Sequence, residues 1–158
     1  MIEGFINEYE DLVVPLTLIL TDEHLIVNSI IDTGFNGYLS VSRYLIEESN
    51  WIYMGHEEYE LANREIIEEE IYLGEIIFDE RIYNVIVVAT NSDEVLIGTR
   101  LLRDKILTVN FCSSRVEIVD CWVRLIEGEI RIKKDSEIAS KIFSAYDGSI
   151  KVKVSESK

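Results

Sequence analysis

An acidic residue directly ends an apolar run in the segment IIDTGF, residues 30–35, and this arrangement can support acid–base chemistry. Removing a carboxylate from water is costly, so an aspartate that follows a buried strand needs a compensating environment. A pair of carboxylates that shares one proton is such an environment, and it can act as general acid and general base. The chain holds no second Asp-Thr-Gly or Asp-Ser-Gly, so a partner for Asp32 would have to come from a second copy of the chain.

Strand patterns on both sides of this aspartate predict the elements that position it. Two apolar runs, residues 12–20 and 24–31, are separated by a short polar turn and predict a β-hairpin. Gly34 and Gly37 predict a turn after the aspartate, and residues 38–42 predict the strand that leaves the turn. Further strands and hairpins are expected in the segments 57–78, 82–90, 106–111, 115–119 and 123–133.

Helical signals are few and short. Ser42 is a suitable N-cap for a helix over residues 43–49, and residues 99–104 predict a second short helix. Residues 137–146 carry apolar side chains on one helical face and predict a third. The sequence therefore predicts a mostly β chain, a closed barrel with two or three short helices.

A second motif, VLIGTRLL at residues 95–102, places Gly98 after an apolar run, 98 − 32 = 66 residues beyond Asp32. The two motifs together, in this order and spacing, resemble those of retropepsin-like (clan AA) aspartic proteases. The Asp-Thr-Gly-Phe form of the first motif is similar to a prokaryotic branch of single-domain members. The resemblance covers roughly residues 10–120.

The resemblance implies a fold and a set of roles. It implies a retropepsin-like closed barrel, one lobe of the acid-protease fold, over residues 1–121, with Asp32 as the catalytic carboxylate. It implies that Thr33, Gly34, Ile97 and Gly98 support the active-site loop. It also implies that the hairpin at 57–78 is a flap over bound peptide, and the candidate substrate-binding residues are Phe35, Gly37, Leu61, Ala62 and Asn63. The three glutamates Glu68–Glu70 in this hairpin are expected to be solvated.

Composition excludes several classes of partner. The 158 residues carry a formal charge of −15, which argues against a nucleic acid and against an anionic membrane. No apolar run is long enough to span a bilayer, and the N-terminal residues lack the features of a signal peptide. Cys112 and Cys121 are expected at opposite ends of a strand, too far apart for a disulfide. These features predict a cytoplasmic protein with reduced thiols and without metal or cofactor.

Two functions follow from these patterns. The first is a homodimeric aspartic endopeptidase that hydrolyses peptides or unfolded proteins with a water activated between two copies of Asp32. The alternative is a catalytically silent retropepsin-like module for dimerisation or peptide binding, which the bulky Phe35 and the glycine-free hairpin tip favour. Residues 122–158 are expected to form a C-terminal hairpin and helix, packed on the same domain or at the dimer interface.

Overall fold

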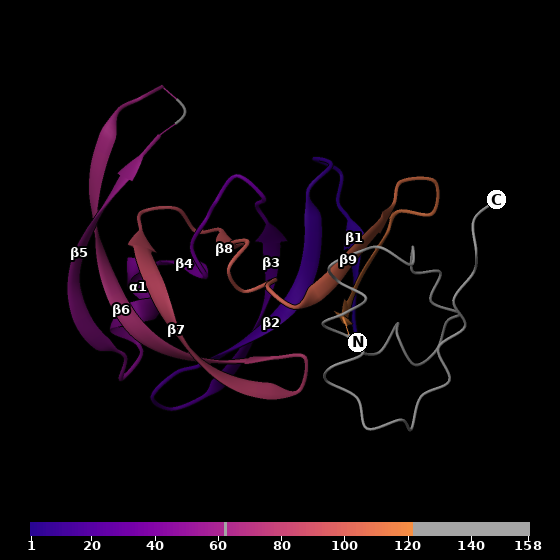
Figure 1. Cartoon of the computed structure of the whole chain (residues 1–158). Coiled ribbons are helices and arrows are strands. Elements are labelled where there is room, and N and C mark those ends of the chain that lie inside the picture. Colours follow the sequence, from indigo (N-terminus) through magenta and orange to yellow (C-terminus); the bar gives the residue numbers. More distant parts are fainter. Residues whose placement is uncertain (62, 122–158) are drawn as a thin grey trace, which may run out of the picture. The chain divides into compact units, whose positions relative to one another are not determined.

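The computed structural model describes residues 1–61 and 63–121, and these residues form ten strands and one short helix (Figure 1). In chain order the elements are β1 (Ile2–Ile6), β2 (Leu12–Ile19), β3 (His24–Ile31), β4 (Leu39–Ser42), α1 (Arg43–Glu47), β5 (Ile52–Glu60), β6 (Ile66–Phe78), β7 (Arg81–Thr90), β8 (Val95–Ile97), β9 (Lys105–Asn110) and β10 (Arg115–Asp120). The chain divides into two compact units, Met1–Ile118 and Val119–Lys158. The hairpin and helix predicted within residues 122–158 lie outside the described residues.

Six strands close into a barrel, which confirms the predicted fold class. They follow the order β6-β7-β4-β8-β3-β2, and β2 returns to β6 through the pairs Thr17↔Ile77 and Leu18↔Ile76. The same edge of β2 pairs with β1 at Leu12 and Val13. Pro15 lies between these two pairings, where β2 changes partner and a missing N–H costs no hydrogen bond.

The barrel interior is filled by aliphatic side chains that alternate along the strands. In β2, Val14, Leu16 and Leu18 are buried, whereas Pro15 and Thr17 point outward. This alternation is the period of a strand with one face on the core. On the barrel strands, the other side chains with no more than 2% exposure are Leu39, Val41, Ile76, Phe78, Val87, Ala89 and Ile97, together with the small polar Ser29. Val116 and Ile118 of β10 are equally buried. Among the described residues, no helix has the length and apolarity that crossing a bilayer requires.

One of the predicted short helices forms in the described part of the chain, and one does not. Helix α1 begins after Ser42, whose hydroxyl accepts a hydrogen bond from the backbone N–H of Leu45 at 3.4 Å. The predicted helix at residues 99–104 is wrong: this segment is a succession of turns with bonds between residues three apart. Asp104 ends it with a φ of 66°, in the left-handed region, where an α-helix cannot continue.

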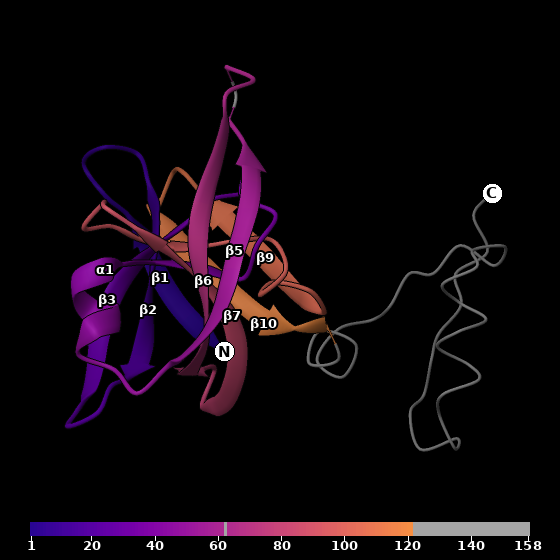
Figure 2. The ribbon, with the colours of Figure 1, turned by 90° about the vertical axis from the view of Figure 1, so that its left-hand side faces the viewer.

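Strand β6 is long enough to belong to two hairpins. Its first half pairs with β5 between Glu60↔Ile66 and Ile52↔Leu73, in agreement with the predicted hairpin in this region. Its second half pairs with β7 through a two-residue turn, Asp79 and Glu80, both with positive φ, as a type I′ turn requires. Figures 1 and 2 show that the β5–β6 hairpin projects beyond the strands of the barrel.

A sheltered ion pair lies at the β6–β7 turn. The Lys105 ammonium lies 3.0 Å from Oδ2 of Asp79, and the two side chains are only 5% and 7% exposed. The α-amino group of Met1 lies 2.7 Å from the other carboxylate oxygen, Oδ1. Burial by itself raises the pKa of Asp79, but the hydrogen bonds from these two cations outweigh it, and the pKa lies below its usual value.

We expect Asp79→Asn to lower the free energy of unfolding by about 1.5–3 kcal/mol near neutral pH, because it removes the carboxylate that accepts hydrogen bonds from the Lys105 ammonium and the α-amino group of Met1. The lowered pKa means that the carboxylate contributes stability above the unfolded-state value, about 3.9, and that this contribution is lost as the pH falls through the folded-state value. Urea unfolding of the wild type and the variant at several pH values measures both effects. The exposed Asp93→Asn is the matched control, and equal stability of the two variants would contradict the expectation.

Candidate active site

The loop that carries Asp32 connects β3 to β4, which lie on either side of β8 in the sheet. Strand β8 lies between β3 and β4, parallel to β3 through Ile31↔Ile97 and antiparallel to β4 through Leu39↔Ile97. The loop 32–38 therefore leaves β3, passes the end of β8 and enters β4. The two sequence motifs, far apart in the chain, meet at this point, as their resemblance to a protease implies.

Four backbone hydrogen bonds fasten this loop to the segment 97–100. The N–H of Asp32 donates to the carbonyl of Ile97 at 2.9 Å, which continues the β3–β8 ladder into the loop. The other three run in the opposite direction, from Gly98 N–H to Tyr38 O, from Thr99 N–H to Phe35 O and from Arg100 N–H to Gly37 O, at 2.9–3.1 Å. The loop is thus held at both ends and in its middle.

Steric crowding around residue 98 leaves room only for glycine. A Cβ at this position would lie 2.1 Å from the carbonyl oxygen of Gly37 and 2.8 Å from Cδ1 of Phe35. Gly37 is similarly confined, because a Cβ there would lie 2.3 Å from Cζ of Phe35. The two glycines let backbone lie on backbone, with the Phe35 ring filling the remaining space.

The carboxylate of Asp32 is oriented by its own loop. Its Oδ1 accepts a hydrogen bond of 2.8 Å from the N–H of Gly34, and its carbonyl accepts one of 3.2 Å from the N–H of Phe35. This is an Asx-type turn, in which the side chain helps to shape the backbone. Asp32 is half-buried, whereas Thr33 and Gly34 are exposed at the tip of the loop. The carboxylate therefore has a fixed direction and remains accessible to solvent.

The hairpin meets the loop through an aromatic contact that the sequence did not indicate. The rings of Phe35 and Tyr59 lie 6.5 Å apart between centroids, with their planes tilted by 56°. The predicted contact residues Leu61 and Asn63 are exposed at the hairpin tip, where the Asn63 carboxamide accepts from the N–H of Glu65. Ala62 lies outside the described residues. Tyr59 of β5 is thus a described hairpin residue whose ring contacts the loop.

Two more side chains complete the surroundings of the loop. The Tyr59 hydroxyl donates to Oε2 of Glu57 at 2.7 Å. Burial and this bond raise the pKa of Tyr59, so its phenol stays protonated as a donor. The Arg100 guanidinium carbon lies 5.9 Å from the centroid of the Tyr38 ring, a cation–π distance. The nearest sequence signal for these residues is the alternation of residues 57–60 and the position of Arg100 two residues after Gly98.

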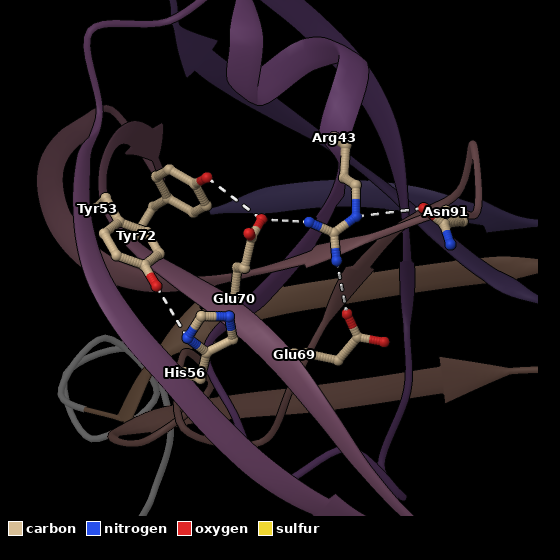
Figure 3. Close-up of polar contacts among 7 residues, drawn as sticks. All are labelled: Arg43, Tyr53, His56, Glu69, Glu70, Tyr72 and Asn91. Carbon is tan, nitrogen blue, oxygen red and sulfur yellow. Dashed lines mark hydrogen bonds and ion pairs between the residues drawn. The ribbon is translucent and has the colours of Figure 1, made fainter.

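The glutamates of the hairpin are not merely solvated, and that expectation is wrong for two of the three. Figure 3 shows Arg43 of α1 between Glu69 and Glu70 of β6. Its Nη2 lies 3.1 Å from Oε2 of Glu69, its Nη1 binds Oε2 of Glu70, and its Nε donates to Oδ1 of Asn91 at 3.2 Å. One guanidinium thus joins the hairpin to α1 and to the loop after β7.

The described residues contain no group of three or more His, Cys, Asp or Glu side chains that could hold a metal ion. Cys112 and Cys121 are both free and exposed.

Comparisons with known proteins add little to this picture. No protein-family model and no curated protein sequence matches the chain. A solved structure of the foamy viral protease-reverse transcriptase in complex with an RNA/DNA hybrid matches 85% of this chain, with 17% identity and a TM-score of 0.44. The match spans 18% of that protein, and at this TM-score it carries no argument about function.

The contact between Gly98 and the loop leads to a first expectation for the site. We expect Gly98→Ala to lower the free energy of unfolding by about 2–3 kcal/mol, since the new methyl group meets backbone that cannot move aside. Gly34→Ala is the matched control in the same loop, because its Cβ would meet only the Asp32 side chain, at 3.2 Å. Denaturant unfolding compares the two variants, and an equal or smaller loss for Gly98→Ala would contradict the steric argument.

Proposed function

We propose that this protein is a homodimeric aspartic endopeptidase, in which each subunit contributes one Asp32. The observation that carries the proposal is the meeting of the two motifs, with the loop 32–38 fixed on Ile97 and Gly98 by backbone hydrogen bonds. This arrangement presents one oriented, half-buried carboxylate at the exit of a strand. A single carboxylate of this kind lacks the second carboxylate that peptide hydrolysis by this mechanism needs, and a two-fold axis would supply it.

The proposed chemistry follows from two carboxylates at close range. Two Asp32 side chains about 3 Å apart cannot both ionise, so they share one proton. The ionised carboxylate takes a proton from a water molecule, which attacks the carbonyl carbon of the peptide bond. The protonated carboxylate donates its proton to the carbonyl oxygen, which gives a tetrahedral intermediate with two hydroxyl groups. The carboxyl group that took the water proton then donates it to the leaving nitrogen as the C–N bond breaks, and the other carboxylate takes back a proton from one hydroxyl, which leaves a carboxylic acid and an amine as the two products. Activity would be highest below neutral pH, because deprotonation of the pair removes the general acid.

Other residues of the loop have supporting roles in this proposal. Exposed Thr33 hydroxyls at the tips of the two loops would hydrogen-bond across the dimer and hold the loops together, as the resemblance implies. Phe35 and Tyr59 would line the space between loop and hairpin, where they offer an aromatic surface to an apolar side chain of an extended peptide. The substrate class would be a peptide or an unfolded protein segment.

One observation favours the alternative, a binding module without catalysis. The Phe35 and Tyr59 rings already contact each other, so the hairpin rests on the loop where a peptide would have to pass. In that case the protein would use the same scaffold to pair with a second copy or to hold a peptide strand, and Asp32 would serve only its turn. Peptide binding would then be unchanged in Asp32→Asn.

The test of the proposal is the Asp32→Asn variant, which keeps the size of the side chain and removes its charge. We expect cleavage of an unfolded protein such as reduced, alkylated casein to fall by at least about 100-fold, the scale of acid–base catalysis. Asp22→Asn, in the turn between β2 and β3, is the control and should cleave as the wild type does. Equal cleavage by Asp32→Asn and the wild type would rule out the catalytic role.

A further inference from the structure

We propose that Arg43 is a positioning residue of the candidate site, which holds the β5–β6 hairpin against the loop that carries Asp32. The inference rests on the proposed function and deepens it, because the position of this hairpin decides what can lie above Asp32. It starts from the charges of the hairpin itself.

The strand pairing of the hairpin places carboxylates directly opposite each other. Glu57 lies opposite Glu69, and Glu58 lies opposite Glu68. Like charges in directly opposed positions of an antiparallel pair repel each other and destabilise it. A cation bound to a glutamate of either pair would reduce this repulsion.

Arg43 supplies that cation from another element. Its guanidinium binds one oxygen of Glu69 and one of Glu70, and its Nε donates to Asn91 (Figure 3). The side chains are partly sheltered, with exposures of 37% for Arg43, 22% for Glu69 and 34% for Glu70. An ion pair that is partly removed from water and made by the planar fork of arginine is stronger and more directional than an exposed one.

Because Arg43 binds Glu69, the carboxylate opposite it, Glu57, is available to bind Tyr59 of the hairpin. Glu57 accepts the hydroxyl hydrogen bond of Tyr59 at 2.7 Å, two residues further along β5 on the same face. The Tyr59 ring in turn contacts Phe35 of the loop. An ion pair, one cross-strand pairing, a hydrogen bond and a ring contact therefore lead from Arg43 to Phe35, three positions after Asp32.

The backbone also connects Arg43 to the loop that carries Asp32. Arg43 follows Ser42, the last residue of β4, and β4 pairs with β8 at Leu39↔Ile97. The carbonyl of this same residue, Ile97, accepts a hydrogen bond from the N–H of Asp32. The cation that holds the hairpin is thus built on the same frame as the loop, and both are fixed relative to each other.

The hairpin has a bending point at the level of this anchor. Its strand pairing is irregular between Tyr53 and Gly55, and Gly55 has a φ of 112°, which favours glycine. Pairing of β6 with β7 begins at Ile71↔Val88, so residues 66–70 extend beyond that ladder. The outer part of the hairpin therefore depends on Arg43 and on the Phe35–Tyr59 contact for its position.

Hydrogen exchange of the full chain tests the anchor directly. In Arg43→Gln we expect backbone amides of residues 55–60 and 66–70 to exchange about ten-fold faster or more, while those of β2 and β3 keep the wild-type rate. Arg115→Gln is the matched control, since it removes an arginine that pairs with Glu3 and Glu117 far from the hairpin in the strand order, and it should leave the hairpin unchanged. Unchanged hairpin exchange in Arg43→Gln, or equal acceleration throughout the chain, would overturn the proposal.

A double variant separates this role from a general loss of packing. Adding Glu69→Gln to Arg43→Gln removes the repulsion with Glu57, so we expect part of the hairpin protection to return. Faster exchange in the double variant than in Arg43→Gln would overturn the repulsion argument. With a cleaved peptide as substrate, Arg43→Gln should raise KM by several-fold more than it lowers kcat. If the wild type cleaves nothing, the proposed function has failed, and hydrogen exchange alone decides on the anchor.

Discussion

The backbone of the loop 32–38 lies directly on the backbone at Gly98, and the arrangement of the site depends on this contact. Since a Cβ at residue 98 would lie 2.1 Å from the Gly37 carbonyl oxygen, the close approach exists only with glycine. It brings the end of β8 between β3 and β4 and lets four backbone hydrogen bonds fix the loop. The direction of the Asp32 carboxylate is therefore a consequence of backbone geometry, with the Gly34 N–H as its local support.

The same frame carries the second component of the site, the hairpin. Strand β4 leaves the loop and ends where Arg43 begins α1, so one short segment connects the carboxylate to the cation that binds β6. The hairpin in turn reaches the loop through Tyr59 and Phe35. The acidic hairpin, unfavourable by its own charges, is thus held by an electrostatic contact at its base and an aromatic contact near the site.

The sequence was sufficient for most of the local elements and for the meeting of the two motifs. Apolar runs and alternation predicted strands in most of the observed places, but β1 was not predicted. Ser42 predicted the start of α1, and the pairing of Asp-Thr-Gly with Gly98 predicted their contact. The predicted helix at residues 99–104 was wrong, because the hydrogen bonds of this segment join residues three apart and Asp104 ends it in the left-handed region. Apolar periodicity does not distinguish such a succession of turns from a short α-helix.

Contacts that depend on the register of distant strands could not be predicted. Nothing in the run Glu68–Glu70 indicates that Arg43, more than twenty residues earlier, binds two of its members. The prediction that the hairpin tip, at Leu61 to Asn63, would contact the site followed from position along the chain, whereas the observed contact of Tyr59 depends on which face of β5 turns inward. These contacts depend on tertiary packing and on charge, which a local sequence pattern does not report.

The most direct test of the central claim, that Asp32 works only with its twin in a second subunit, is cleavage by mixtures of wild-type and Asp32→Asn chains after joint refolding. If each site needs both carboxylates, an equal mixture holds about a quarter of its dimers as fully wild-type, so cleavage should fall to about a quarter of that of the same total amount of wild-type protein. Cleavage at about half of the wild-type value, in proportion to the fraction of wild-type chains, would show that one chain suffices and would contradict the account.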